Sequence, residues 1–531
     1  MAKPIALRQA QQVPPFKGDE TGIEVVPKPF WAPPKGLDYL DRKNRVPPSH
    51  CPEITNLYLD RGVLKSRKGT VAIGSASTEE VMGVVNFVVA SGIGFLLRFT
   101  TTHLQQWDGT TWNNVSGGTF TGSNAAYFTY TAFGNTLLFS NGIDGLWEFA
   151  PLIGTLNQIA DGPNALHLST FGGRVLATNA DYPGRLDWCA KNNSHDWTGV
   201  GSGNEELLST PGGKVDALMG VWPVTDDFAL MVRASSVWQV GQTGDPDAPF
   251  RFGRLHPNVG SRSRHSIDVI PGGLIMFGTD DVWVVSDSGV KPIGQLVKDR
   301  MLTESSDITK ARGIYRPETK EYWLVTGVTN TLYRYSFPDE GWTRHKYSFD
   351  IRWVEQSIFH MSGVTWDEMV GTWDSHPETW DSLLGSPRPA QLLFATDSDA
   401  GASYIIAEDD AAVTDQIIQS DKEAQGIEIQ TPIIEAASPL DKTEIIECQI
   451  EYEQGVASQT VFIEYSTDGG TTWDSYSQKD LALTPGRPKI KRAMKTLERE
   501  AFQLRLRSAA LGQLILISFS PFLVVGAKKE P

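Results

Sequence analysis

Short apolar runs separated by turn residues dominate the pattern of hydrophobic and polar positions from about residue 51 to 360. The runs come in pairs around Gly, Asn or Asp, as in TLLFSNGIDGLWEF, GGLIMFGTDDVWVVSDSG and EYWLVTGVTNTLYRYS. Paired runs of this kind predict antiparallel β-hairpins, and very little of the region has the 3.6-residue period of a helix. We therefore expect a long series of hairpins.

Tryptophans recur at nearly even intervals along these hairpins. They are Trp107, Trp147, Trp188, Trp238, Trp283 and Trp323, with gaps of 40, 41, 50, 45 and 40 residues. One four-stranded propeller blade occupies a similar length. The spacing favours a β-propeller, and a multi-sheet β assembly is the second interpretation.

Strict alternation of apolar and polar residues returns between residues 426 and 531, as in Phe502-Gln-Leu504-Arg-Leu506-Arg. Alternation predicts strands with one face in water, and about one hundred residues is the usual size of a β-sandwich. By contrast, residues 1–50 are rich in proline and have no period, which predicts an extended arm. The arm could dock on a neighbouring subunit or pack on the chain's own body.

These patterns predict an all-β fold with a β-propeller-like body, a C-terminal β-sandwich and an extended N-terminal arm. The expected divisions are a Pro-rich arm at 1–50, a propeller-like domain at 51–360, a strap and connection at 361–425 and a sandwich at 426–531.

The expected strap holds three copies of Thr-Trp-Asp spaced seven residues apart. The copies are Thr365-Trp366-Asp367, Thr372-Trp373-Asp374 and Thr379-Trp380-Asp381. Pro377 argues against one continuous helix through all three, while Thr and Asp can satisfy local turn amides. We expect the tryptophans to fill a groove, because buried tryptophan usually serves packing; an aromatic ladder for a ligand is the alternative.

A second motif, STDGGTTW, matches the Asp-box pattern S-x-D-x-G-x-T-W at Ser466, Asp468, Gly470 and Trp473. Asp468 can accept hydrogen bonds from turn amides, Gly470 tolerates a positive φ, and we expect Trp473 to pack beneath the hairpin. Asp-boxes recur in sialidase propellers. A sialidase also needs a tyrosine nucleophile with a carboxylate base and arginines, and the sequence singles out no such set.

The net charge is −16, from 63 acidic and 47 basic residues, whereas a dedicated nucleic-acid binder usually presents a basic face. The segment that most resembles a membrane span, residues 81–97, has no charge over 17 residues. Its β-branched content and central Ser-Gly are those of two strands and a turn, so we expect no membrane insertion. The three cysteines are far apart and suggest neither zinc nor disulfides but reduced, buried thiols.

Templates for catalysis and for metal or cofactor binding are missing from the sequence, so we expect no enzyme activity, metal or cofactor. Asp280 and Asp281 fit a hairpin turn better than a catalytic pair. Two basic groups could meet DNA or an acidic partner, although solvated faces are the preferred interpretation. They are Arg251, Arg254, Arg262, Arg264 and His265, and the segment KIKRAMK at 489–495.

Three segments give the chain a resemblance to the tail nozzle or tail hub proteins of short-tailed bacteriophages. They are SHCPEITNLYLDRGVLKSRKGT at 49–70, NVGSRSRHSIDVIPGGLIMFGTDDVWVVSDSGVKPIG at 258–294, and the Thr-Trp-Asp triplet followed by LLFATDSD. The resemblance spans most of residues 49–531 and includes no catalytic motif.

The resemblance implies a structural protein of the virion, made in the host cytoplasm and assembled into the short tail. It implies a homo-oligomeric, sixfold ring beneath the portal and its adaptor, in contact with tail fibres or spikes. The ring would retain packaged DNA and release it on host contact, and an acidic lumen would let DNA pass without specific binding. A carbohydrate-binding or glycosidase propeller and a cytoplasmic propeller scaffold remain the alternatives.

Overall fold

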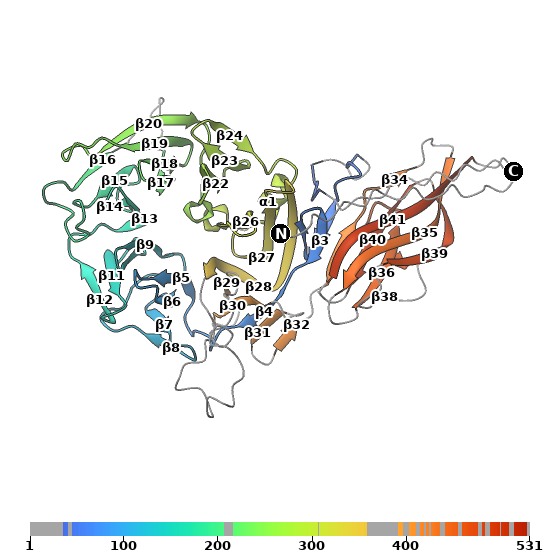
Figure 1. The fold of residues 1–531 in the computed structure, drawn as a ribbon, viewed down its shortest axis with the longest axis horizontal. Helices are drawn as coiled ribbons and strands as arrows, with labels where there is room; N and C mark the ends of the chain where they lie inside the picture. The colour runs from blue at the N-terminus through green and yellow to red at the C-terminus, as the bar shows by residue number, and fades with distance from the viewer. Residues whose placement is uncertain are drawn as a thin grey trace, which may run out of the picture.

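The computed structural model describes residues 35–40, 45–206, 216–305, 307–357, 391–396, 403–409, 415–418, 421–423, 426–435, 441–454, 459–475, 481–483, 489–499, 501–508 and 514–527. Most of the expected N-terminal arm and all three Thr-Trp-Asp copies lie outside these residues. The described chain is almost entirely β-structure, with a ring of blades on one side and a smaller β module beside it (Figure 1).

Five blades are separate four-stranded sheets that follow one another along the chain and surround a common axis (Figure 1). In each blade the first strand lies nearest the axis and the fourth lies at the rim. Blades one to three consist of β5 (Val81–Val88), β6 (Gly94–Thr100), β7 (Leu104–Trp107) and β8 (Trp112–Asn114); β9 (Thr129–Phe133), β10 (Thr136–Ser140), β11 (Leu146–Ala150) and β12 (Thr155–Ile159); and β13 (Ala165–Phe171), β14 (Arg174–Asn179), β15 (Arg185–Trp188) and β16 (Gly203–Glu206). Blades four and five consist of β17 (Leu218–Pro223), β18 (Phe228–Arg233), β19 (Ser236–Gln242) and β20 (Phe250–Pro257); and β21 (Asp268–Ile270), β22 (Gly273–Phe277), β23 (Val282–Ser286) and β24 (Gly289–Pro292).

Two further blades belong to a 16-stranded sheet and share the 17-residue strand β28 (Gly341–Ser357). Blade six consists of β25 (Arg312–Arg316), β26 (Glu321–Val325), β27 (Thr329–Ser336) and the first part of β28. The register of β28 shifts near Ile351, and its last part pairs with β29 (Gln391–Thr396) to begin blade seven. The blade continues through β30 (Ile405–Asp409) and ends on β4 (Gly69–Ala72), which comes from the start of the chain. The described residues therefore form a seven-bladed propeller whose ring is closed by an N-terminal strand.

The module beside the propeller consists of two sheets that pack face to face. One contains β1 (Glu53–Thr55), β33 (Ile427–Gln430), β34 (Ile434–Glu435), β36 (Gln459–Ser466), β37 (Asp474–Ser475), β38 (Leu481–Leu483) and β40 (Ala501–Ser508). The other contains β2 (Leu57–Asp60), β3 (Val63–Ser66), β35 (Asp441–Gln454), β39 (Lys489–Arg499) and β41 (Leu514–Ala527). Buried side chains such as Ile429 and Leu506 from one sheet and Tyr452 and Leu516 from the other join one hydrophobic cluster.

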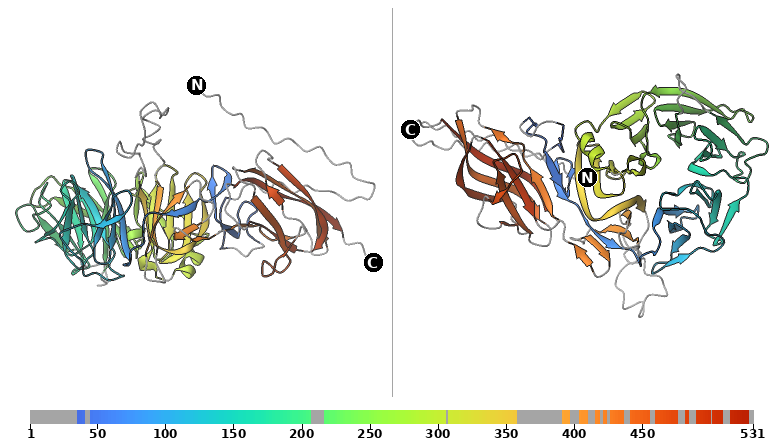
Figure 2. Two further views of the ribbon diagram at one scale, coloured as in Figure 1. Left: turned by 90° about the horizontal axis from the view of Figure 1, so that it is seen from below. Right: turned by 180° about the vertical axis from the view of Figure 1, so that it is seen from behind.

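Strand β1 connects the two bodies through backbone hydrogen bonds. It pairs in parallel with β28 at Arg344 and antiparallel with β33, so one sheet continues from blade six into the C-terminal module. Figure 2 shows the two bodies side by side along the long axis of the molecule. The remaining elements are the hairpin β31 (Asp415–Ile418) and β32 (Asp421–Glu423), the helix α1 (Lys298–Glu304) and the short turns η1 (Arg264–Ser266) and η2 (Ile308–Lys310).

The repeated tryptophans mark the blades as the sequence predicts. Trp107, Trp147, Trp188, Trp238 and Trp283 all lie on the third strand of their blades, while Trp323 lies on the second strand of blade six. The uncharged segment at residues 81–97 forms most of the hairpin β5–β6, as predicted. In the part of the chain that the structure describes, no helix has the length and apolarity that crossing a membrane requires.

Candidate functional site

Polar side chains from blades that are not neighbours meet near the propeller axis. Tyr130 on β9 donates a hydrogen bond from Oη to Oε2 of Glu355 on β28, at 2.5 Å. Asp268 on β21 lies within electrostatic reach of both, and its Oδ2 accepts the backbone N–H of Tyr315 at 2.6 Å. We call Asp268 and Glu355 the axial carboxylates.

Burial disfavours the charged form of both axial carboxylates. It raises the pKa of Glu355 to about 7, with a smaller contribution from the negative charge of Asp268, while the bond from Tyr130 lowers it. Burial likewise raises the pKa of Asp268 to about 6, although the hydrogen bonds that it accepts from two backbone amides lower it. Strongly shifted carboxyl groups that lie together mark candidate functional sites, because catalysis and binding require such shifts.

A basic group surrounds the aromatic rings of Tyr127 and Trp353. The guanidinium of Arg312 on β25 stacks over Tyr127, with its Cζ 3.8 Å from the ring centroid, and lies 5.0 Å from that of Trp353 on β28. The ring of His265 lies 5.3 Å from that of Trp353 and 6.0 Å from that of Tyr127. Arg264 precedes His265. Burial lowers the pKa of both His265 and Arg312, and the charge of Arg264 lowers each further. We call Arg264 and Arg312 the axial arginines.

These contacts place side chains across the axis of the propeller. Tyr127, just before blade two, reaches His265 before blade five and Arg312 in blade six. Tyr130 of blade two bonds directly to Glu355 of blade seven. A DNA duplex, whose major groove alone is about 12 Å wide, does not fit through an axis bridged in this way. The gap between the ribbons in Figure 1 is therefore not a passage for DNA.

The basic group that the sequence predicts at residues 251–265 is divided by the fold. Arg251 and Arg254 lie exposed on β20 at the rim, as a solvated face requires. The prediction is wrong for Arg264 and His265, which are partly buried at the axis because η1 turns the chain inward before blade five. For residues 489–495 the structure describes the strand but not the side chains.

Sequence reasoning missed the axial site as a whole. Its residues come from four separate stretches of the chain, and no two neighbours among them form a recognised motif. The single available signal was the pair Arg264–His265, which interrupts a Ser-rich turn.

The Asp-box residues form the turn that the motif predicts, between β36 and β37. Asp468 accepts hydrogen bonds from the Thr472 hydroxyl at 2.6 Å and from the amides of Thr471 and Thr472, and Gly470 has a φ of 87°. Ser466 Oγ binds both Asp468 Oδ1 and the Gly470 amide. The arrangement is that of a stable turn.

Trp473 differs in part from the expectation that it packs beneath the hairpin, because it is only half-buried and the guanidinium of Arg505 on β40 stacks over it at 4.4 Å. A related turn, DGTTW at 108–112 in blade one, was missed because it lacks the leading serine. Asp108 there accepts the amides of Thr110 and Thr111 at 2.8 and 2.7 Å.

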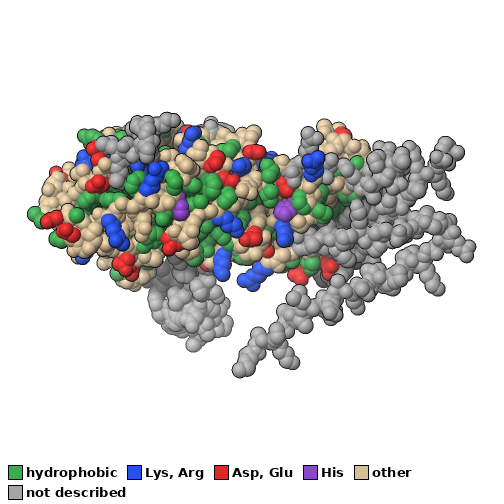
Figure 3. Space-filling model, turned by 90° about the horizontal axis from the view of Figure 1, so that it is seen from above, with side chains coloured by type: hydrophobic (Ala, Val, Ile, Leu, Met, Phe, Trp, Pro, Cys, Tyr) green, Lys and Arg blue, Asp and Glu red, His purple; other side chains and the backbone are tan. Residues whose placement is uncertain are grey.

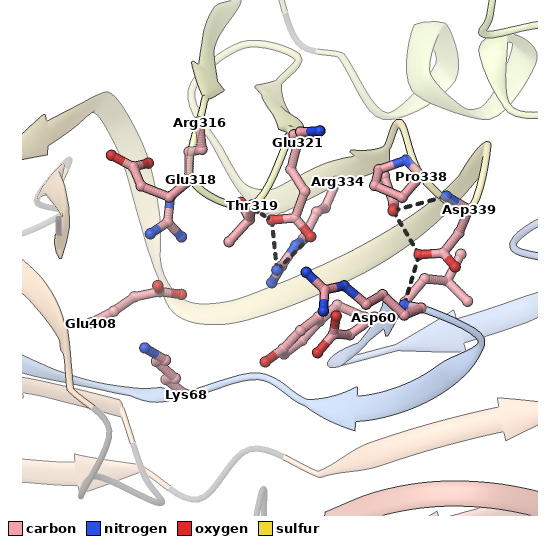
Figure 4. Close-up of a pocket in the computed structure, with 15 residues that line it drawn as sticks. Asp60, Lys68, Arg316, Glu318, Thr319, Glu321, Arg334, Pro338, Asp339 and Glu408 are labelled. Carbon is pink, nitrogen blue, oxygen red and sulfur yellow. Dashed lines mark hydrogen bonds and ion pairs between the residues drawn. The ribbon is translucent and has the colours of Figure 1, made fainter. Parts of the chain in front are cut away.

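A charged cavity of about 480 Å³ lies where the propeller meets the C-terminal module (Figure 4). Blade six provides Glu321 and Arg334, whose ion pair measures 2.6 Å, and the Arg334 guanidinium stacks 3.7 Å above the ring of Tyr58 on β2. Asp339 accepts the amides of Arg61 and Gly62 in the β2–β3 turn. Arg334 and Asp339 of blade six thus contact the C-terminal module across this cavity.

Beside the cavity, Arg67 and Asp415 form a completely buried ion pair at 2.6 Å. Arg67 also donates to the carbonyls of Lys68 and Lys346 and to the side chain of Asn56. This pair joins the segment before β4, the end of blade six and the β31 strand. We call Arg67, Asp415, Glu321 and Arg334 the junction ion pairs.

The remaining candidate groups have structural surroundings. Asp281 lies in the β22–β23 hairpin turn, as predicted, and accepts the amides of Val282 and Gly294. Cys51 and Cys189 are buried free thiols, and burial raises the pKa of each. Among the described residues no three His, Cys, Asp or Glu side chains converge as metal ligands. The face in Figure 3 intersperses acidic and basic side chains.

No family model and no curated protein matches the chain. Solved structures with similar folds include the β-propeller domain of Cps50 (Swd1) from Myceliophteria thermophila, at 9% identity and a TM-score of 0.38, covering 64% of this chain and 98% of that one. The WD40 domain of Toxoplasma gondii coronin has 10% identity and a TM-score of 0.35 over 67% and 87%. YCF48 bound to D1 peptide has 11% identity and a TM-score of 0.38 over 67% and 98%. The chain is thus a β-propeller protein, an assignment that its own strand pairing establishes.

Proposed function

We propose that the chain is a structural subunit of a short bacteriophage tail, forming the nozzle or hub ring through which packaged DNA leaves. The observation that carries this proposal is the continuous sheet from blade six through β1 into the C-terminal module. Strand β1 pairs with β28 at Thr55 and Arg344 and with β33 along its three residues, so backbone hydrogen bonds continue across the joint. Such a joint suits a part that holds pressurised DNA. A flexible linker would be the ordinary connection between independent domains.

Charge pairing at the junction supports the same role. The completely buried pair of Arg67 and Asp415 joins the segment before β4 to β31. The pair of Glu321 and Arg334 within blade six holds the Arg334 guanidinium over Tyr58 of the C-terminal module. Buried pairs of this kind give specificity of arrangement rather than net stability. A subunit that must keep one orientation within a ring benefits from such specificity.

The filled propeller axis determines where the conduit would be. Because side chains from opposite blades meet at the axis of each propeller, the DNA would pass through a lumen enclosed by several copies. We therefore propose a homohexameric ring beneath the portal and adaptor, contacting fibres or spikes at its outer surface. The net charge of −16 would keep DNA from adhering to that lumen.

The mass of the full chain in solution tests this proposal. Native mass spectrometry of the chain alone, and mixed with the adaptor protein of the same phage, should give a closed ring or a monomer that becomes a ring on the adaptor. A chain that remains monomeric with adaptor and portal present would contradict the proposal. An unrelated seven-bladed propeller of similar mass is the matched control for nonspecific adaptor binding.

One observation favours a second candidate, a carbohydrate-binding or glycosidase propeller. A tyrosine bonded to a glutamate, with a second carboxylate in reach, has the residue types of a glycosidase with a tyrosine nucleophile. Release of 4-methylumbelliferone from a panel of acidic and neutral glycosides would detect the activity, and Tyr130→Phe should abolish it. Wild-type protein without turnover of any member would remove this candidate.

A further inference from the structure

Buried arginines such as Arg334 and Arg344 have a buried Nε without an acceptor among the described residues, but another N–H group of each binds a carboxylate. Arg67 and Arg334 face carboxylates, and Arg98 donates to the Gln105 side chain at 2.6 Å and to the Ser75 carbonyl at 3.3 Å. The axial arginines differ. Arg312 is 2% exposed, yet its one hydrogen bond runs from Nη1 to the adjacent Ala311 carbonyl, and its Nε and Nη2 are buried without an acceptor.

Arg264 shows the same shortage. Its side chain makes no hydrogen bond or ion pair with a described residue, and its Nη1 is buried. Burial lowers the pKa of both axial arginines to about 10, which leaves them charged at neutral pH. Folded proteins seldom bury charged donors without acceptors, because each such group loses its hydration and gains nothing in return.

The aromatic rings around Arg312 do not remove this shortage. Tyr127 and Trp353 lie over the guanidinium, where they interact with its charge. The five N–H bonds of a guanidinium point outward in its own plane, and only an acceptor in that plane can satisfy them. The two rings thus hold the guanidinium in position and leave its edge available.

The surrounding charge favours an anion as the missing acceptor. Arg352 adds a third cation, although it is paired with Glu80 at 2.7 Å. Neither axial carboxylate lies within 4.0 Å of an axial arginine. Burial, and then the positive charge of the axial arginines, lowers the pKa of His265 well below its ordinary value, so this ring is neutral. The charged side chains that act on Arg312 are Arg352 and Arg264, so the charge around its guanidinium is positive.

We propose that the axial arginines bind one small oxyanion, a phosphate or carboxylate group, which accepts hydrogen bonds in the guanidinium plane of both. Arginine is the side chain best matched to planar, two-point contact with such groups. Arg264, which is only partly buried, gives the site its contact with solvent. Binding of the oxyanion does not depend on the proposed tail function, since the site lies inside a single propeller.

Thermal unfolding of the full chain tests the site. A ligand that binds the folded state raises Tm progressively with its concentration above Kd. Sodium phosphate or sodium acetate should raise Tm, and sodium chloride at the same ionic strength should not. The phosphate and acetate arms distinguish the two sources of the oxyanion. Equal effects of all three salts, or no effect of phosphate and acetate, would overturn the proposal and leave water as the partner of these N–H groups.

Variants then locate the effect. Arg264→Gln should weaken anion binding, measured by isothermal titration calorimetry, at least tenfold, and Arg312→Gln should do so where the variant folds. Arg98→Gln is the matched control: it removes a buried arginine of blade one that already has acceptors, and anion affinity should stay within twofold. Unchanged affinity in Arg264→Gln would refute the site even if Arg312→Gln does not fold.

Discussion

Buried charge is arranged in opposite ways at the junction and at the propeller axis. At the junction, Arg67 and Asp415 are completely buried and pair with each other, and the nearly buried Arg334 and Glu321 pair at 2.6 Å. At the axis, Arg312 and Glu355 are enclosed by protein, yet neither has an oppositely charged partner within 4.0 Å among the described residues. Paired charges specify how two bodies join. Unpaired ones retain the ability to bind a proton or a ligand.

The largest expected effect tests the pairing at the junction. Asp415→Ala leaves the Arg67 guanidinium buried with no counter-charge, which should lower the free energy of unfolding by about 3–5 kcal/mol. Urea unfolding of the full chain measures the change. Glu340→Ala is the control, because its pair with Lys291 is exposed, with side chains 65% and 70% accessible, and should be worth less than about 1 kcal/mol. Similar losses of unfolding free energy in both variants would mean that the buried pair of Arg67 and Asp415 contributes no more than the exposed pair of Lys291 and Glu340.

Apolar packing at the same junction provides a second measure. Ile54 on β1 is completely buried in the cluster shared by blade six and the C-terminal module. Ile54→Ala should cost about 3 kcal/mol through lost burial and the cavity that remains. Ile143→Ala, at a residue 52% exposed in the β10–β11 turn, is the control and should change the free energy of unfolding little. If Ile54→Ala is as mild as the control, β1 does not connect the two bodies tightly.

The sequence predicts features formed by residues close together in the chain and misses features formed by residues far apart. The blades were predictable because each hairpin and its tryptophan lie within about 40 residues, as from Trp107 to Trp147. Ring closure was not, since Ile406 pairs with Ala72 across more than 300 residues. The Asp-box turn at Asp468 is local and was recognised. The axial site is assembled from four stretches, those of Tyr130, Asp268, Arg312 and Glu355, and only the closed ring brings these together.

The stability that the axis contributes should depend on pH. Glu355 has an ordinary pKa of 4.5 and a folded-state pKa of about 7, so folding takes up a proton between these values. An acid with a raised folded-state pKa stabilises the protein at low pH and loses this contribution as pH rises through about 7. Glu355→Gln mimics the protonated form and keeps an acceptor for Tyr130. Relative to wild type, it should therefore gain on the order of 2 kcal/mol between pH 5 and pH 8.

Urea unfolding at the two pH values measures this gain. Glu205→Gln, at an exposed glutamate of β16, is the matched control and should show none. A variant whose stability runs parallel to wild type across the range would show that Glu355 ionises normally in the folded protein.

The smallest effect concerns a feature that both bodies share. Asp108 in blade one and Asp468 in the C-terminal module each accept hydrogen bonds from two turn amides. In the variants Asp108→Ala and Asp468→Ala these amides lose their acceptor. Both turns are exposed, so water replaces the lost acceptor and Tm should hardly change. Hydrogen exchange should instead quicken at Thr110 and Thr111 in one variant and at Thr471 and Thr472 in the other. A large fall in Tm for Asp468→Ala alone would mean that the C-terminal turn supports its module through Trp473 and Arg505, a role that the blade-one turn would then lack.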